Sequence, residues 1–210
     1  MRYNSVNFLL AMLGILLLSA FLRGTGWDWD AGHHLHPDER FLTMVTADLT
    51  WPTSLGEYLD SARSPLNPRN LKEGFFLHDQ REHIFFAYGT LPITLTKGLA
   101  LLLDQDGYDA CHLVGRALSG ILDLGVVLLT ALLARLIFRS PHISLLAALV
   151  QGLTVLAIQQ SRFYIVDPWS GFFLTLSLVC VAWALTSSRP THPTGPNHLA
   201  RLALAGIPLG

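Results

Sequence analysis

The sequence predicts an all-α protein, a polytopic bundle of membrane-spanning helices with a long outer loop that carries juxtamembrane helices. Two compositional observations indicate this class: 51% of the 210 residues are hydrophobic and only 14% are charged, whereas about a quarter of a soluble domain is charged. The third is a series of apolar runs of roughly 17 to 25 residues, the length that crosses a bilayer. A net charge of -1 gives no electrostatic case for nucleic acid as a partner, and we expect none.

The hydropathy pattern indicates five spans along one partial membrane module, 1–210, and the last of them is incomplete. The first run follows Arg2 and could be a cleaved signal peptide, with Ser19-Ala20 as a weak cleavage site. Its length and the spans that follow favour a retained membrane helix. The expected spans are 6–22, 113–138, 143–160, 169–186 and 199–210.

The basic residues set the orientation, because cytoplasmic connections are enriched in Lys and Arg. The basic regions are Arg2, Arg135 with Arg139, and Arg189 with Arg201. With these regions inside, segments 23–112 and 161–168 lie outside, on the extracytoplasmic face of the cell membrane. Every acidic residue except Asp123 then falls on the outer side, although only basic residues entered the assignment.

The orientation requires the apolar segment 84–103 to begin and end outside. We therefore interpret it as an interfacial or re-entrant helix, which its Gly89, Pro92, Lys97 and Gly98 also favour. In the alternative, this segment crosses the membrane fully, and the acids on either side of it lie on opposite faces.

Within the outer segment, 38–49 is predicted to be a helix whose apolar face carries Phe41, Leu42, Val45 and Leu49. His36 is suited to the N-cap of this helix, and Pro37 to its first turn.

The pair Asp38-Glu39 begins this helix. Acids at a helix start are favoured by the helix dipole, which would make the pair purely structural. Asp38, however, precedes Phe41, Leu42 and Val45 at helical intervals, which places it on the apolar face. A partly desolvated carboxylate there is suited to act as a general base.

A second candidate acid, Asp167, follows the third predicted span. It could simply cap the next helix, with Pro168 in the first turn and Tyr164 and Trp169 as interfacial aromatics. The functional interpretation adds Arg162, an outer-surface cation suited to binding a phosphate.

Arg116 and Asp123 lie inside the predicted span 113–138. Ionisable residues within a membrane usually face a bundle interior or a cavity. Arg116 is near the outer end and could reach a lipid phosphate, whereas Asp123 is deeper and is predicted to order the bundle through a partner that the sequence does not identify.

Three histidines, His33, His34 and His36, precede the acidic pair. A divalent metal could be bound by His36 together with Asp38 or Glu39. Loop histidines without regular ligand spacing are more often ordinary polar residues, and no cofactor is certain.

Four short motifs, in this order, resemble those of the GT-C class of membrane glycosyltransferases, and in particular its protein O-mannosyltransferase and aminoarabinose transferase branch. They are Asp38-Glu39 in the first outer loop, Tyr88-Gly89 with Pro92 at a helix start, Gly115-Arg116 with Ser119 at a span start, and the run from Ser161-Arg162 to Asp167-Pro168. Each motif is weak by itself, and the shared order makes the resemblance more specific.

The resemblance implies inverting transfer of a sugar from a polyprenyl-phosphate donor to a hydroxyl of a protein or lipid acceptor, at the outer leaflet. Asp38 would be the catalytic acid of the first outer loop, with Glu39 beside it, and Asp167 the acid of the second. Some relatives have a lysine just before the proline of the interfacial helix, where this chain has Thr90-Leu91. Members of the class are longer, so we expect an N-terminal fragment, whose activity by itself is an open question.

These inferences predict that Asp38 takes the proton of the acceptor hydroxyl as it attacks the anomeric carbon. The leaving phosphate already carries charge and needs cations, for which Arg116, Arg162 and Arg40 are candidates. Two alternatives remain open: a transporter whose pathway is lined by Arg116 and Asp123, and a non-catalytic membrane scaffold subunit.

Overall fold

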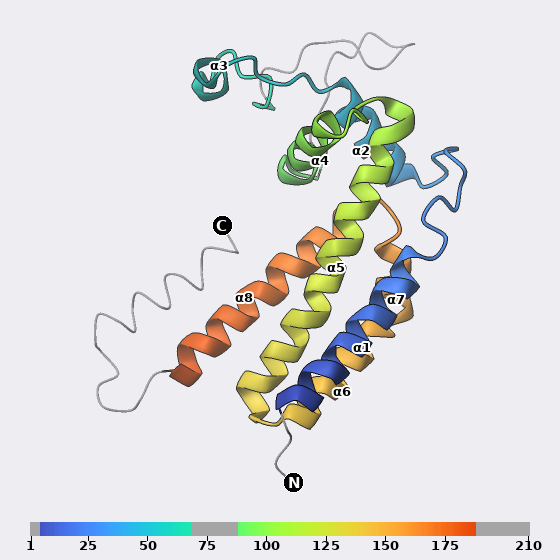
Figure 1. Ribbon diagram of the computed structural model, residues 1–210. Coiled ribbons are helices and arrows are strands. Elements are labelled where there is room, and N and C mark those ends of the chain that lie inside the picture. The colour runs from blue at the N-terminus through green and yellow to red at the C-terminus, as the bar shows by residue number, and fades with distance from the viewer. Residues whose placement is uncertain (1–4, 69–87, 188–210) are drawn as a thin grey trace. The chain divides into compact units, whose positions relative to one another are not determined.

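The computed structural model describes residues 5–68 and 88–187, and in these ranges the chain is built from eight helices without a strand (Figure 1). The predicted all-α class is confirmed. Three described helices are long and apolar enough to cross a membrane: α1 (Ser5–Gly24), α5 (Tyr108–Phe138) and α8 (Asp167–Ser187). They lie where the sequence predicts the first, second and fourth spans, whereas the fifth, 199–210, falls outside the described residues.

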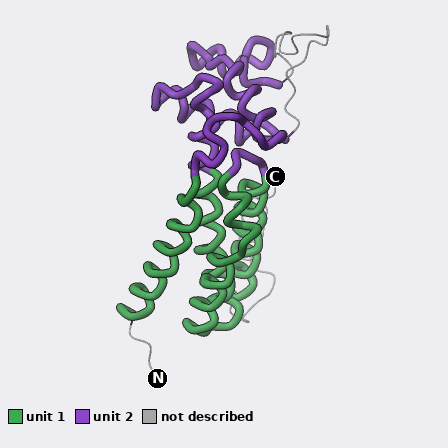
Figure 2. Tube along the Cα trace, turned by 90° about the vertical axis from the view of Figure 1, so that its right-hand side faces the viewer, with its two compact units in different colours: residues 1–26, 119–162, 167–210 green, residues 27–118, 163–166 purple. Residues whose placement is uncertain are grey.

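The chain divides into two compact units, coloured separately in Figure 2. Unit 1 comprises residues 1–26, 119–162 and 167–210, and unit 2 comprises residues 27–118 and 163–166. The boundary falls within α5, which has 31 residues and is therefore about 46 Å long. A hydrocarbon core of about 30 Å is shorter than this, so the first turns of α5 can extend beyond it.

In unit 1, α1 packs against α6 (Pro141–Gly152), and α7 (Val155–Gln160) follows α6. The predicted span 143–160 is thus two consecutive helices, interrupted at Leu153 and Thr154. The first of them begins conventionally, since the Ser140 hydroxyl accepts a hydrogen bond from the Ile143 amide at 3.5 Å.

Small residues line the packing surfaces of unit 1. Val127, Ala131 and Ala148 form a buried cluster, and Met12, Ile15 and Leu16 of α1 pack against it. The Ser144 hydroxyl donates a hydrogen bond to the Ala131 carbonyl at 2.7 Å, which joins α6 to α5. Close approach through small residues and hydroxyl contacts is typical of membrane helices, because lipid gives no hydrophobic drive for helix association.

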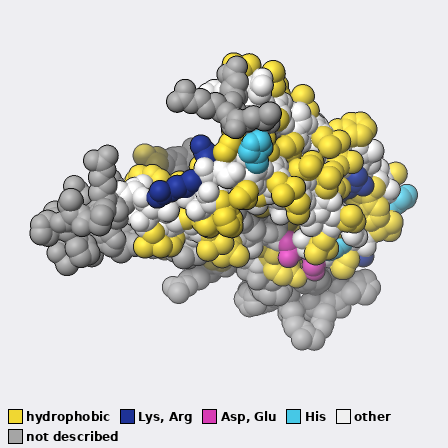
Figure 3. Space-filling view, turned by 90° about the horizontal axis from the view of Figure 1, so that it is seen from below, with side chains coloured by type: hydrophobic (Ala, Val, Ile, Leu, Met, Phe, Trp, Pro, Cys, Tyr) yellow, Lys and Arg dark blue, Asp and Glu magenta, His cyan; other side chains and the backbone are white. Residues whose placement is uncertain are grey.

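Large apolar side chains remain exposed on the candidate spans. On α1, for example, Leu9 and Leu17 are 64% and 62% exposed. Figure 3 shows hydrophobic side chains over most of the described surface on one face. Exposed apolar surface of this extent is unfavourable in water and is expected of helices that contact lipid.

A buried ion pair crosses unit 1. The Nε and Nη2 atoms of Arg23, at the end of α1, each lie 2.6 Å from one carboxylate oxygen of Asp123 on α5. Arg23 also donates to the carbonyls of Ser19 and Gly152, at 3.1 and 3.0 Å. Asp123 therefore has the structural partner that the sequence analysis expected without identifying it.

Unit 2 is built around α2 (Pro37–Asp48) and α4 (Leu91–Leu102). The short α3 (Leu55–Leu59) lies between them in the sequence. As predicted, His36 is the N-cap of α2 and Pro37 begins it; the His36 Nδ1 atom accepts a hydrogen bond from the Glu39 amide at 3.4 Å.

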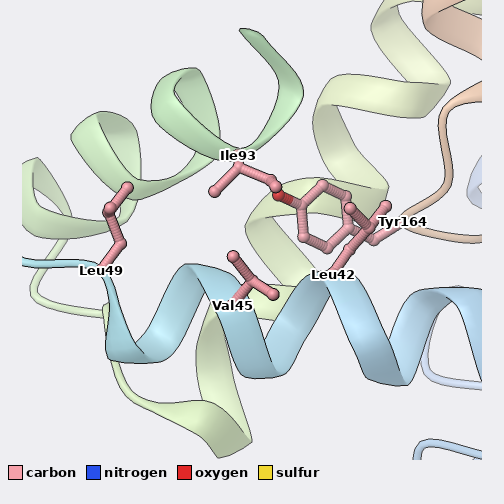
Figure 4. Packing of buried hydrophobic residues seen from close by; sticks show 5 residues of the cluster. All are labelled: Leu42, Val45, Leu49, Ile93 and Tyr164. Carbon is pink, nitrogen blue, oxygen red and sulfur yellow. The ribbon is translucent and has the colours of Figure 1, made fainter. Parts of the chain in front are cut away.

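The core of unit 2 is formed by Leu42, Val45, Leu49, Ile93 and Tyr164 (Figure 4). Phe41 packs against this cluster. The predicted apolar face of 38–49 is thus confirmed.

Tyr164 and Trp169 are both buried, so their prediction as interfacial aromatics is wrong. Tyr164 is fully buried in unit 2, with its hydroxyl 2.8 Å from the Thr46 hydroxyl and donating to the Pro92 carbonyl at 3.3 Å. These two contacts satisfy the hydrogen bonding of the Tyr164 hydroxyl, so the tyrosine can be buried in the core without leaving that group unpaired. Burial raises the pKa of Tyr164 above its ordinary value.

Helix α4 has 12 residues and is about 18 Å long, too short to cross a hydrocarbon core of about 30 Å. Its Lys97 is buried, and the ammonium group donates to the Ala47 carbonyl at 3.1 Å and the Asp106 carboxylate at 2.9 Å. This hydrogen bond and the charge of Lys97 hold the pKa of Asp106 below its usual value. These features support an interfacial helix, although residues 84–87 lie outside the described ranges.

We predict that Gly115→Ala destabilises the protein, because a Cβ atom at this position of α5 would overlap the ring of the buried Tyr164. Overpacking of this kind costs about 1–3 kcal/mol. Thermal unfolding of the detergent-solubilised protein should show a lower midpoint. Gly120→Ala on the same helix is the matched control, because the nearest atom to its Cβ would lie at 3.9 Å. Equal midpoints for the two variants would contradict the packing described here.

Candidate functional site

The two acids at the start of α2 occupy opposite environments. Glu39 is fully buried, whereas Asp38 is exposed. The predicted burial of Asp38 is therefore wrong. The buried stripe of α2 includes Thr43 and Thr46, which are both 0% exposed. Thr43 and Thr46 lie four and seven residues after Glu39, so Glu39 shares their buried face of the helix and Asp38 does not.

Asp38 contacts a residue of another predicted motif. The Tyr88 hydroxyl donates a hydrogen bond to the Asp38 carboxylate at 3.0 Å. Tyr88 precedes Gly89, whose φ of +84° lies in the left-handed region that glycine adopts without strain. The Asp-Glu and Tyr-Gly-x-x-Pro motifs thus meet at the carboxylate proposed as the base.

Glu39 is held by Arg116 of α5. The Arg116 Nε atom lies 2.6 Å from one Glu39 carboxylate oxygen, and Nη2 lies 3.1 Å from the other. This is the bidentate geometry that makes guanidinium–carboxylate pairs strong and directional. Arg116 is only 2% exposed, so the pair is shielded from water.

The remaining donors of Arg116 bind the loop before α2. Its Nη2 atom also donates to Asp30 at 2.9 Å, and Nη1 donates to the Trp27 carbonyl at 2.9 Å. The guanidinium lies 5.7 Å from the ring centre of Trp29, within cation–π range. Arg116 thereby fixes both the acidic motif and the loop that leads to it.

Sequence reasoning missed Asp30, although it is buried and lies directly in this cluster. Burial alone would raise its pKa, but the hydrogen bond and charge of Arg116, with the Leu35 amide at 3.3 Å, lower the pKa below its usual value. The sequence did contain one indication of this contact. Arg116 lies near the outer end of an apolar span and needs an acidic partner, and the outer loop contains Asp28 and Asp30.

The other predicted residues lie in different surroundings. Arg40 is exposed on α2, and His36 packs its ring 4.5 Å from that of Phe163. Arg162 donates to the Leu22 carbonyl at 2.7 Å in unit 1, and Asp167 is exposed at the first position of α8. Because Asp38 belongs to unit 2 and Asp167 to unit 1, a pocket shared by the two acids stays a prediction.

The predicted metal ligands are engaged elsewhere. The His36 Nδ1 atom caps α2, and Glu39 is bonded to Arg116. Among the residues described, a different set brings ligand atoms close enough together for an ion: Asp28, Asp30 and His112.

Comparison with known proteins decides the family. The family model of the dolichyl-phosphate-mannose-protein mannosyltransferases matches residues 104–210, half of the chain. The chain belongs to this family. No curated protein and no solved structure matches it.

This assignment confirms the resemblance to GT-C glycosyltransferases that the motif order indicates. The family consists of membrane mannosyltransferases that take the sugar from dolichyl phosphate and act on protein. The matched half contains Arg116, Arg162 and Asp167, whereas Asp38 and Glu39 precede it. The contacts between Arg116 and Glu39 connect the matched half to the acidic motif.

We predict that Arg116→Met strongly destabilises unit 2, because it leaves Glu39 and Asp30 buried without their cation. Removing one partner of a buried ion pair typically costs about 3–5 kcal/mol. The thermal unfolding midpoint of the purified protein is the measurement. Arg40→Met, an exposed arginine one residue from Glu39, is the control and should change stability by no more than about 0.5 kcal/mol. Equal midpoints for Arg116→Met and the parent protein would contradict the role given to this cluster.

Proposed function

We propose that this protein moves a mannosyl residue from dolichyl or another polyprenyl phosphate to a hydroxyl of a protein acceptor. Transfer would take place at the extracytoplasmic face of the membrane, with inversion at the anomeric carbon. The observation that supports the proposal is the difference between the two acids of the pair. Glu39 is buried and bonded to Arg116, while Asp38 beside it is exposed.

Asp38 is the general base in this proposal. Its carboxylate accepts the proton of the acceptor hydroxyl while the hydroxyl oxygen forms a bond to the anomeric carbon. The bond between that carbon and the phosphate oxygen breaks, and the lipid phosphate leaves with the electron pair. Within the described ranges, the Asp38 carboxylate accepts a hydrogen bond from Tyr88 at 3.0 Å, and its other lone pairs are available for this proton.

Glu39 and Arg116 act as positioning residues. A base contributes to rate only when it is held within hydrogen-bond reach of the proton that it abstracts. The first turn of α2 is fixed by the His36 cap and by the bidentate pair with Arg116. This arrangement supports a rigid placement of Asp38, the residue directly before Glu39.

Phosphate contact is assigned first to Arg40 and Arg162. Arg116 already donates to protein acceptors through all three of its nitrogens, which favours the positioning role. Arg40 is exposed, and Arg162 directs one nitrogen to the Leu22 carbonyl. The leaving group is anionic, so a guanidinium beside it stabilises the charge without supplying a proton.

The structure removes the main argument for the transporter alternative. It rests on Arg116 and Asp123 as unpaired intramembrane charges that could line a pathway. Asp123 is paired with Arg23, and Arg116 with Glu39 and Asp30. Both charges therefore have a structural explanation within their own unit.

We predict that Asp38→Asn in the full-length protein lowers mannosyl transfer by 10² to 10⁴, the usual contribution of a positioned base. Asparagine keeps the shape and the hydrogen bond with Tyr88 but cannot take the proton. The assay follows labelled mannose from dolichyl phosphate mannose to an acceptor peptide in proteoliposomes. Asp48→Asn, an exposed acid at the other end of α2, is the matched control. Transfer near the parental rate by Asp38→Asn would remove Asp38 from the mechanism.

The proposal also requires Asp38, Asp106 and Asp167 to face the same side of the membrane. We predict that single cysteines at these positions, with Cys111 and Cys180 replaced by alanine, all react with an impermeant maleimide in intact cells. A cysteine introduced at Arg139 should react only after permeabilisation. Labelling of position 106 or 167 that requires permeabilisation would separate the two acids and contradict a shared site.

A further inference from the structure

A second cluster of ligand-type side chains lies in unit 2, outside the predicted catalytic pair. Asp28 and Asp30 come from the loop before α2, and His112 comes from the beginning of α5. Each offers one ligand atom, and these atoms all lie within 4.8 Å of one another. Carboxylate oxygens and imidazole nitrogens are shared by many divalent metal sites.

His112 supplies an independent observation. It is 1% exposed, and neither ring nitrogen has a hydrogen-bond partner among the described atoms. The ring packs edge-on against that of His34, with 4.5 Å between centres, and both nitrogens of His34 are likewise buried without a partner. Most buried polar side-chain atoms in folded proteins are satisfied, so two adjacent unsatisfied imidazoles require an explanation.

The charges around His112 favour a cation. Three carboxylates, those of Asp28, Asp30 and Glu39, lie near the single guanidinium of Arg116. Glu39 uses both of its oxygens on Arg116, whereas the Asp28 contact is long, at 3.9 Å. Pairing with Arg116 thus explains the position of Glu39 but leaves excess negative charge beside an unsatisfied imidazole.

The geometry is close to that of a metal site. Zn–N and Zn–O bonds of about 2.0–2.2 Å place ligand atoms about 3.3–4.3 Å apart, so small side-chain movements would close the set. Asp30 is oriented by the Leu35 amide and by Arg116, as outer-shell contacts orient metal ligands. The side chain of Asp28 is 58% exposed, which leaves one side of the cluster open to solvent.

We propose that Asp28, Asp30 and His112 bind one divalent transition-metal ion, with one nitrogen and two oxygen ligands from the protein and solvent at the open position. The ion neutralises the excess carboxylate charge and uses a ring nitrogen that otherwise has no partner. It also links the loop before α2 to α5, next to the contacts that Arg116 makes with Trp27 and Asp30. This site does not depend on the proposed transfer reaction.

The experiment is a metal titration of the full-length protein, purified in detergent with an affinity tag that contains no histidine and stripped with a chelator. Zn²⁺ binding is measured by calorimetry, and Co²⁺ binding by its visible absorption. We expect one saturable site with a Co²⁺ spectrum that includes a nitrogen ligand. Asp28→Asn and His112→Gln should each weaken binding at least tenfold, whereas the exposed neighbours Asp109→Asn and His33→Gln should bind as the parent does.

A folding control accompanies the titration. Asp28 is exposed, so the metal-free Asp28→Asn variant should unfold at the parental temperature. Zn²⁺ at a concentration that saturates the parent should raise the midpoint of the parent, because a ligand that binds only the folded state stabilises it, and should raise that of Asp28→Asn less. The absence of saturable binding, or equal affinity in Asp28→Asn and the parent, would overturn the proposal. So would loss of binding in Asp38→Asn with retention in Asp28→Asn.

Discussion

The arrangement of unit 2 depends on one buried guanidinium. Arg116 extends from α5 to Glu39 at the start of α2 and to Asp30 and Trp27 in the loop before it. These residues are separated from Arg116 by 77 to 89 positions in the sequence. Desolvating a guanidinium is costly unless its donors are satisfied, so the position of α5 restricts the loop and α2 to arrangements that present acceptors to it.

Unit 1 is also held by a buried arginine that is paired with an acid on another helix. Arg23 of α1 is buried against Asp123 of α5 and against the carbonyl of Gly152 on α6. Apolar helices in lipid have little preference for one neighbour over another, because their surfaces match the solvent that surrounds them. A buried charge pair restores that preference, since any misregister would leave an ion without its partner. Each unit therefore combines non-specific apolar packing with a specific ionic contact around a buried arginine.

The parts of this structure that follow local rules could be predicted from the sequence. Apolar run length located α1, α5 and α8, and the His36-Pro37 sequence located the start of α2, because both depend on neighbouring residues only. The burial of Glu39 in place of Asp38 could not be predicted, since it depends on Thr43 and Thr46 being buried against partners distant in sequence. Asp30 and His112 were missed for the same reason: their environment is created by contacts between the outer loop and α5.

The geometry of a helix explains why an adjacent pair of acids is useful at the start of α2. Successive residues in an α-helix point about 100° apart, so the side chains of Asp38 and Glu39 leave the helix in clearly different directions. With Glu39 directed inward to Arg116, Asp38 lies at the edge of the buried face of α2 and is exposed. The buried acid fixes the rotation of the helix about its axis, and the exposed acid takes its direction from that rotation. A base that has to be placed accurately but remain free to accept a proton is therefore best located beside the residue that anchors the helix, rather than being the anchor itself.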